Sequence, residues 1–319
     1  MRHVLMSSMK DEGPFVLEFV AHHRVLGFDA IHVASNDCSD GTDLLLDALA
    51  AQGAITHLPN RLKPGERPQR RAYEKMREAF DTDRADWIMA LDVDEFLFVN
   101  VGAGRVGDLT ALAGPEVDVI SLSALSFGTS ENEAWQPGRV TEQFTRRLPE
   151  KARQNAPVKS LSRGQGRWRG VQNHHPVGFL GGGDIAAMRG NGEVMAVPDD
   201  GKLWTHLRNF PPRLIAHDCA WYNHYTIKSI ESFLLRGLRG NGAAAIGEEI
   251  GQRWNESYWA QFAAANIADR RITARYGAET AAEMARLLSL PGVAEAQAEA
   301  EARYAGKIAA LAEADRPDG

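Results

Sequence analysis

The chain has 319 residues, of which 44% are hydrophobic, enough to bury the core of one large α/β domain with an appendage or of two domains. Its formal net charge of −6 gives it no general attraction for nucleic acid, so we expect no nucleic-acid partner, although local basic clusters can still bind phosphate. Two cysteines, Cys38 and Cys219, exclude a disulfide framework and fit a reducing compartment.

The first eight residues contain too few apolar side chains for a signal peptide, and no apolar run approaches the length of a membrane span. We therefore expect a cytoplasmic protein. A peripheral contact with a membrane stays compatible with this sequence.

Strands and helices alternate along the first third of the chain. Short apolar runs bounded by turn residues predict strands, and apolar residues at helical spacing before a glycine or after a proline predict helices. We expect strands at 4–6, 30–34, 54–58 and 85–97, helices at 14–26, 42–52 and 69–80, and a loop at 59–68. This alternation predicts an α/β fold with a mostly parallel sheet flanked by helices.

The pattern changes beyond residue 108. A short helix at 109–113 and a strand at 117–125 precede a stretch, 127–209, that is rich in Gly, Arg, His and Trp. Short segments in which apolar and polar residues alternate, such as 139–145 and 158–162, predict a smaller mixed sheet with long loops. The last third predicts helices at 229–238, 257–276 and 278–312. Because the last of these has few apolar residues, we favour a solvated helical end over a dimer-forming or membrane-surface helix.

Three carboxylates end the apolar run at 85–97, namely Asp92, Asp94 and Glu95. In an open α/β sheet, ligands bind outside the carboxyl ends of the strands. Because side chains alternate between the two faces of an extended strand, Asp92 and Asp94 should point the same way and Val93 into the core. Like charges in a dry crevice call for a cation, and oxygen ligands favour Mg²⁺ or Mn²⁺. The alternative is that these acids only end the strand, as turn residues do.

Two further loops follow predicted strands, so a parallel sheet brings them to the same edge as the acidic run. One is 10–13, and the other is 36–41 with Thr42. The second loop carries short acceptors beside a helix start, which suits hydrogen bonds to a base or ribose. We select Asp37 for the nucleobase, and ordinary turn and capping chemistry is the alternative.

A second cluster, 221–229, mixes aromatic residues with His224 and Lys228, and Arg236, Arg239 and Gly240 follow it. His224 can add a nitrogen ligand to a metal held by carboxylates, and Lys228 can hold a phosphate oxygen. A histidine among aromatics is more often packed and hydrogen-bonded than ligating.

A third cluster, 173–176, contains His174 and reads either as a pocket lining or, more simply, as a polar turn before Pro176. Six basic residues can offset diphosphate charge, and Lys159 is the best single candidate among them. The six are Arg146, Arg147, Lys159, Arg163, Arg167 and Arg169.

Several of these segments recur together, in the order seen in a known family. They are 10–13, Glu18 with His23, 36–42, 87–96, 127–130, Lys159 with Ser160, and His224-Tyr225 with Lys228-Ser229. Over roughly the first three-quarters of the chain, this ordered set resembles the family 2-like glycosyltransferases of the GT-A fold, in the branch related to family 92. The chain departs from the family pattern at Asp11, where the family often has Asn, and around 131–133 on the acceptor side.

The resemblance implies a GT-A (Rossmann-like) domain at 1–240, with a nucleotide-binding half at about 1–100 and an acceptor-side half at about 101–240. A helical C-terminal region, 241–319, would follow. Asp92 and Asp94 would form the Asp-x-Asp metal motif, Asp37 would lie near the base, and His224 with Lys228 would close on the diphosphate. Together with the residue chemistry above, this gives Asp92, Asp94 and His224 as the expected ligands of Mn²⁺ or Mg²⁺. The expected nucleotide-sugar-binding residues are Lys10, Glu12, Asn36, Asp37, Asp40, Asp92, Lys159 and Lys228.

The first functional hypothesis is a metal-dependent, inverting glycosyltransferase that uses a UDP- or GDP-sugar and a carbohydrate or lipid-linked acceptor. The sequence is compatible with a homodimer and does not determine the oligomeric state. Asp94 would be essential, and Glu131 and Glu133 are the candidates for the base that takes the acceptor proton, with exposed loop acids as their alternative interpretation. A metal-dependent sugar-nucleotide hydrolase or nucleotidyltransferase is the second hypothesis. A non-catalytic sugar-nucleotide binding protein is the third.

Overall fold

The computed structural model describes residues 1–238 and 255–314. Its first third alternates strands and helices, as the sequence predicts, with small shifts of their ends. The elements are β1 (His3–Met9), α1 (Gly13–Val25), β2 (Ala30–Ser35), α2 (Thr42–Ala51), β3 (Thr56–Pro59), α3 (Pro68–Phe80), the short helix η1 (Thr82–Arg84) and β4 (Trp87–Ala90).

The middle of the chain contains mostly short strands. They are β5 (Glu95–Val99), β6 (Val119–Ser126), β7 (Arg146–Arg147), β8 (Val158–Arg163), β9 (Trp168–Val171), β10 (Pro176–Phe179), β11 (Ile185–Arg189), β12 (Val194–Val197) and β13 (Ala220–His224). Short helices lie between them, namely α4 (Val106–Leu112), α5 (Val140–Gln143), η2 (Arg153–Asn155), α6 (Leu203–Leu207) and η3 (Pro212–Leu214). The described remainder comprises α7 (Ile230–Leu238), α8 (Glu256–Ala263), β14 (Ile267–Ala268), α9 (Arg271–Leu288) and α10 (Val293–Ala314).

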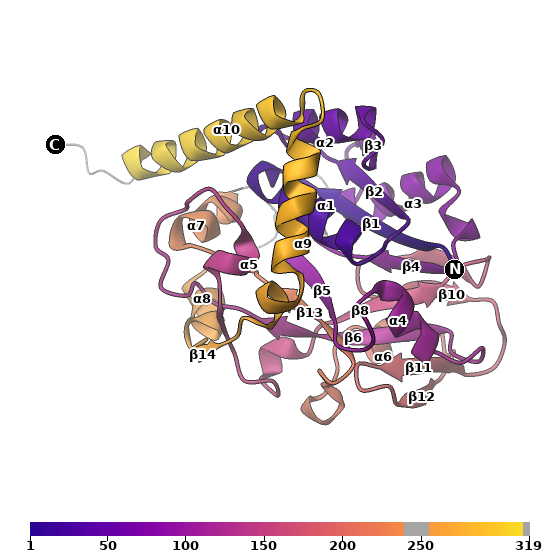
Figure 1. Cartoon of the computed structure of the whole chain (residues 1–319). Coiled ribbons are helices and arrows are strands. Elements are labelled where there is room, and N and C mark those ends of the chain that lie inside the picture. The colour runs from indigo at the N-terminus through magenta and orange to yellow at the C-terminus, as the bar shows by residue number, and fades with distance from the viewer. Residues whose placement is uncertain (239–254, 315–319) are drawn as a thin grey trace.

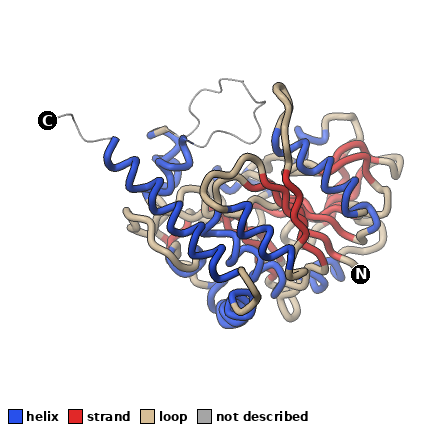
Figure 2. Tube along the Cα trace, turned by 90° about the horizontal axis from the view of Figure 1, so that it is seen from above, coloured by secondary structure: helices blue, strands red, loops and turns tan. Residues whose placement is uncertain are grey.

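One large sheet organises the molecule, in the order β12-β11-β6-β8-β4-β1-β2-β3 (Figures 1 and 2). Strands β4, β1, β2 and β3 pair in parallel, whereas β8 runs antiparallel to both β4 and β6. β13 joins β6 in parallel and β5 in antiparallel fashion. β9 and β10 form a small separate antiparallel sheet. The predicted α/β architecture is therefore confirmed, and its parallel half carries the loops that the sequence analysis singled out.

The parallel half of the sheet is buried on both faces. Along β1, Leu5 packs into the larger core cluster with α1 and α2, while Val4 and Met6 pack with Tyr73 and Met76 of α3 on the other face. Because side chains alternate along a strand, an all-apolar run is what a doubly covered strand requires. Helices on both faces therefore fix the position of β1, whose carboxyl end leads into the loop at 10–12.

The acidic run is not one strand. β4 ends at Ala90, and a tight turn precedes β5, which begins at Glu95. Two bonds close this turn: the Glu95 amide donates to the Asp92 carbonyl at 2.9 Å, and the Asp92 amide donates to the Glu95 carboxylate at 2.8 Å. The predicted strand at 85–97 is wrong in this respect, because β5 leaves β4 to pair with β13. Val93 is buried, as expected.

Two other local predictions are wrong. The piece at 139–145 contains the short helix α5, because the buried Glu18 carboxylate accepts hydrogen bonds from the Val140 and Thr141 amides at its start. The helix predicted at 257–276 is interrupted between α8 and α9. There β14 pairs with β7, and Asp269 accepts bonds from the Arg271 amide and the Arg147 guanidinium.

The C-terminal helices are not a solvated end. α9 lies across α1, and α10 packs against α1 and α2 (Figure 1). Val293, Ala300 and Tyr304 of α10 are buried. The approach is close because Gly13 lacks a side chain: a Cβ there would lie 2.7 Å from the Cβ of Ala300. The predicted domain boundary at residues 240 and 241 lies outside the described residues. Within the described ranges, no helix is both long enough and apolar enough to cross a membrane.

Candidate functional site

Three potential metal ligands converge at the turn between β4 and β5. One ligand atom each of Asp94, Glu95 and His224 lies within 4.8 Å of the others. The antiparallel pairing of β5 with β13 sets this geometry, because Glu95 is the register partner of His224. The Tyr225 amide donates to the Asp94 carbonyl at 2.9 Å and holds the turn against the end of β13. The sequence predicted Asp94 and His224 in this role, whereas Glu95 stands where Asp92 was expected.

Asp92 faces a different set of partners. Its carboxylate accepts hydrogen bonds from Gln69 at 2.9 Å, Asn173 at 3.0 Å and the Lys159 ammonium at 3.1 Å. Lys159 is fully buried and lies 2.6 Å from the Glu95 carboxylate as well. Asn173, from the polar turn that the sequence analysis noted, thus orients Asp92, and Lys159 links the two acids.

Asp94 pairs with a different cation. The Arg236 guanidinium, from α7, donates to Asp94 Oδ2, and His224 Nε2 lies 3.8 Å from the same oxygen. Burial opposes ionisation of Asp94, but the charges of Arg236, His224 and Lys228 together with the hydrogen bond from Arg236 outweigh it and hold the pKa of this carboxyl well below its usual range. The other oxygen, Asp94 Oδ1, is buried and has no hydrogen-bond partner among the described residues.

Burial favours the neutral form of the two neighbouring groups, Glu95 and His224. Burial raises the pKa of Glu95 to about 8, and the charges of Asp92 and Asp94 add to the rise against the opposing effect of Lys159. Burial lowers the pKa of His224 to about 4, so its imidazole is neutral at pH 7. Glu95 would give up its proton to ligate a cation, so a neutral imidazole, the Asp94 carboxylate with its orphaned buried oxygen and Glu95 are a donor set that fits Mn²⁺ or Mg²⁺.

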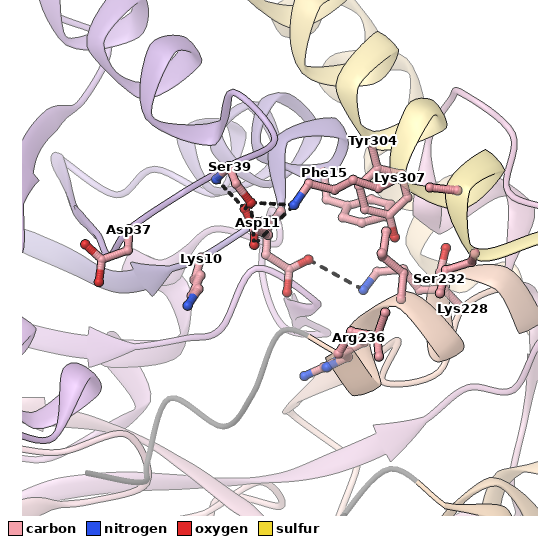
Figure 3. A pocket seen from close by; sticks show the side chains of 15 residues that line it. Lys10, Asp11, Phe15, Asp37, Ser39, Lys228, Ser232, Arg236, Tyr304 and Lys307 are labelled. Atoms are coloured by element: carbon pink, nitrogen blue, oxygen red, sulfur yellow. Dashed lines mark hydrogen bonds and ion pairs between the residues drawn. The ribbon is translucent and has the colours of Figure 1, made fainter. Parts of the chain in front are cut away.

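A cavity of about 500 Å³ opens at the carboxyl ends of β1 and β2, and Arg236, which donates to Asp94, lines it (Figure 3). The loops that follow the two strands form one wall, α7 forms another, and α10 forms a third. The lining residues are Lys10, Asp11, Glu12, Phe15, Asp37, Ser39, Lys228, Ser232, Leu235, Arg236, Leu238, Tyr304, Lys307, Ala310 and Leu311. Lys10, Glu12, Asp37 and Lys228 were all predicted as nucleotide-sugar-binding residues, and the structure brings them to one cavity.

Lys228 is held firmly in this cavity. Its ammonium lies 4.4 Å from the centre of the Phe15 ring and 4.0 Å from the Glu12 carboxylate. Its backbone φ of 50° is uncommon for a residue with a side chain. Such conformations persist where the surrounding structure enforces them, and they gather at functional sites.

Other predicted site residues lie elsewhere. Asp40 is fully buried and holds two helix starts together, because its carboxylate accepts bonds from the Gly13 and Thr42 amides, each at 2.9 Å. Asn36 is buried and bonded to Asn60. We therefore leave both out of the ligand set proposed below.

The two candidate bases also lie outside the cavity lining. The side chain of Glu131 is 81% exposed and lies 3.5 Å from Arg146, and Glu133 is exposed in the same loop. Neither residue therefore belongs to the site proposed below.

The sequence analysis missed the contribution of α10. Tyr304 packs against Phe15, with ring centres 5.6 Å apart, and Lys307 lies 3.6 Å from the Asp11 carboxylate (Figure 3). Tyr304 is the sole aromatic residue after position 292, which was the one available signal that this helix packs onto something. Arg236 was noted only as a residue that follows the cluster around His224.

Comparisons with known proteins give distant likenesses only. No family model and no curated protein sequence matches the chain. S. aureus TarS, solved with UDP-GlcNAc, aligns over 100% of this chain and 94% of its own, at 9% identity and a TM-score of 0.34. Glucosyl-3-phosphoglycerate synthase from Mycobacterium tuberculosis, solved with Mn²⁺, UDP and glucosyl-3-phosphoglycerate, has 14% identity and a TM-score of 0.27.

The alignment with that synthase covers 50% of this chain and 56% of the synthase, so the chain spans about half of its length. A putative glucose-1-phosphate thymidylyltransferase from Bacillus anthracis, solved with sucrose, aligns over 82% of this chain and 83% of its own, at 10% identity and a TM-score of 0.29. The function proposed below rests on the site itself.

Proposed function

We propose that the protein is a metal-dependent glycosyltransferase, which moves a sugar from a nucleoside diphosphate to an acceptor hydroxyl. The proposal includes a GT-A fold of the family 2-like kind, in the branch related to family 92, and inversion at the transferred carbon. UDP- and GDP-sugars are the donor classes, and a carbohydrate or a lipid-linked sugar is the acceptor class.

One observation carries the proposal: a cavity with anion-binding groups adjoins a group of potential metal ligands. Lys228 and Arg236 line the cavity, and Arg236 also contacts Asp94 of the ligand group. A ligand held here would place its phosphates between basic side chains and a divalent ion. Asp37, exposed at the end of β2 on the same cavity, is the side chain available to a base or ribose hydroxyl.

The chemistry follows from these positions. In the transfer, the acceptor oxygen forms a bond to the anomeric carbon as the bond from that carbon to the diphosphate oxygen breaks. Negative charge then grows on the diphosphate, and Lys228 and Arg236 stabilise it through charge-assisted hydrogen bonds. Asp94, Glu95 and His224 would hold the ion, which supplies further charge stabilisation on the leaving group. The acceptor proton passes to a base, for which the cavity offers Glu12 and Asp11.

The alternative enzyme class has less support. Cleavage at phosphorus by a hydrolase or nucleotidyltransferase commonly uses two metal ions or a glycine-rich basic loop after the first strand. Within the described part of the chain there is one group of potential metal ligands, and the loop after β1 reads Lys10-Asp11-Glu12-Gly13.

A thermal-shift screen tests the proposal without knowledge of the acceptor. A nucleoside diphosphate that binds the native protein should raise its melting temperature, and the rise should depend on Mn²⁺. We expect UDP or GDP with Mn²⁺ to do this for the wild type and for Asp200→Asn, an exposed carboxylate away from the cavity, and not for Asp94→Asn. If neither nucleotide shifts the wild type in Mn²⁺, the proposal is wrong.

Product analysis then separates the reaction classes. Release of an intact nucleoside diphosphate together with a glycosylated acceptor supports transfer. Release of a nucleoside monophosphate and a sugar phosphate supports cleavage at phosphorus instead. The anomeric configuration of the product, measured by nuclear magnetic resonance, tests inversion.

A further inference from the structure

Arg236 belongs to two neighbouring parts of the site at once. Its Nη1 donates to Asp94 Oδ2 and to the Thr226 carbonyl, the latter at 2.9 Å, and the residue also lines the cavity. The side chain is 17% exposed, whereas that of Asp94 is 1% exposed. Arg236 therefore reaches from a buried carboxylate to an open cavity.

The guanidinium contacts the carboxylate that a metal would need. Asp94 is a member of the potential ligand group, and Arg236 and His224 already approach its Oδ2. In the described structure Lys159 pairs with Asp92 and Glu95, and Arg236 pairs with Asp94. A divalent ion beside Asp94 would meet strong repulsion from a guanidinium that stayed in place, because both lie in a poorly solvated site.

Lys159 and Arg236 have different surroundings, and only Arg236 has a cavity beside it in the described structure. Lys159 is fully buried, contacts Asp92, Glu95 and Asn173, and does not line the cavity. Arg236 lines the cavity, so a change of its side-chain rotamer can carry the guanidinium from Asp94 toward a ligand in the cavity. Its planar fork of donors suits phosphate oxygens.

We propose that Arg236 takes the place of a divalent cation on Asp94 while the cavity is empty, and transfers to the phosphates of the ligand when that cation binds. This inference rests on the proposed function, because it presumes a metal and a nucleoside diphosphate in the same site. One residue then couples the two binding events: the cation releases Arg236 from Asp94, and the nucleotide holds Arg236 away. By linkage, each ligand increases the affinity for the other.

Measurements of binding test this directly, with the whole chain and no turnover. Mn²⁺ binding is followed by electron paramagnetic resonance, and UDP and GDP binding by calorimetry in EDTA, for the wild type and Arg236→Gln. We expect Arg236→Gln to bind Mn²⁺ roughly tenfold more tightly than the wild type in the absence of nucleotide, since a charge-assisted hydrogen bond no longer competes. The same variant should bind the nucleotide several-fold more weakly in EDTA, and the coupling between Mn²⁺ and nucleotide should shrink.

Lys228→Gln is the matched control for charge alone. Its ammonium also favours ionisation of Asp94, but no hydrogen bond joins the two residues in the described structure. If the hydrogen bond from Arg236 to Asp94 competes with the metal, Mn²⁺ affinity should rise greatly in Arg236→Gln and only slightly in Lys228→Gln. Arg236→Met, which keeps the aliphatic stem, serves as a second variant should Arg236→Gln not fold.

The outcomes are distinct. Equal gains for the two positions, or an Mn²⁺ affinity in Arg236→Gln or Arg236→Met that is unchanged or weaker, would overturn the role of Arg236 while the proposed function stands. A wild type that binds neither Mn²⁺ nor UDP nor GDP would overturn the proposed function and this inference together.

Discussion

Glu95 and His224 lie opposite each other across the antiparallel pair of β5 and β13, where β5 begins and β13 ends. Directly opposed residues in such a pair project from the same face of the sheet. The site therefore depends on a strand pairing and not on one acidic loop. Each element alone would leave the ligand group incomplete.

The imidazole of His224 should matter for metal binding and little for folding. His224→Ala should weaken Mn²⁺ binding by at least the roughly 10- to 100-fold that loss of an outer-shell partner costs. Calorimetric titration with Mn²⁺ in the presence of UDP measures this. His206→Ala, at a half-exposed histidine paired with Asp200, should leave the affinity unchanged. An unaltered affinity in His224→Ala would remove this residue from the ligand set.

Asp94 and Arg236 should show strong energetic coupling. Loss of one partner leaves the other charged group largely buried, which costs about 3–5 kcal/mol of folding free energy. Asp94→Asn should therefore be less stable than the wild type, and the double variant Asp94→Asn with Arg236→Gln should recover part of that loss. Urea unfolding of the four proteins gives the coupling free energy. Strictly additive losses would mean that this ion pair contributes nothing in solution.

The docking of α10 depends on the absence of a side chain at Gly13. Gly13→Ala places a Cβ 2.7 Å from the Cβ of Ala300, so α10 must shift, at a cost of about 1–3 kcal/mol. Because α10 lines the cavity, nucleotide affinity should fall as well. The control is Gly306→Ala on α10 itself, where the new Cβ meets no atom within 4 Å and the helix should gain about 1 kcal/mol. Equal stability of Gly13→Ala and the wild type would show that this close approach is absent.

Glu18 should give the fold a measurable dependence on pH. Burial raises its pKa from the ordinary value of 4.5 to about 7, against the opposing hydrogen bonds from Thr141 and Val140. The folded chain thus holds more protons than the unfolded chain between these values, so this group makes stability fall as pH rises from about 4.5 to about 7. The slope is on the order of 1 kcal/mol per pH unit within that window.

Glu18→Gln cannot titrate, so it should lack this contribution. Urea unfolding of the wild type and the variant at pH 5 and pH 7.5 isolates it, because the buried histidines contribute equally to both proteins. If the difference in unfolding free energy between the two proteins is the same at both pH values, Glu18 titrates normally.

The sequence by itself determined the parallel half of the fold and a large part of the cavity. Apolar runs and turn residues predict the first strands and helices locally, and the carboxyl ends of parallel strands share one edge. Lys10 and Asp37 could therefore be assigned to one site before their distances were known. The chemistry of acids and imidazole likewise selected Asp94 and His224.

Only the tertiary structure decided which acid accompanies them and what closes the cavity. Glu95 replaces Asp92 in the ligand group because β5 turns away to pair with β13, a contact between segments far apart in the chain. Arg236 and α10 reach the site through packing of the same kind, at Asp94 and at Gly13. Local patterns predict which element forms, whereas the pairing of distant elements depends on how their surfaces fit together.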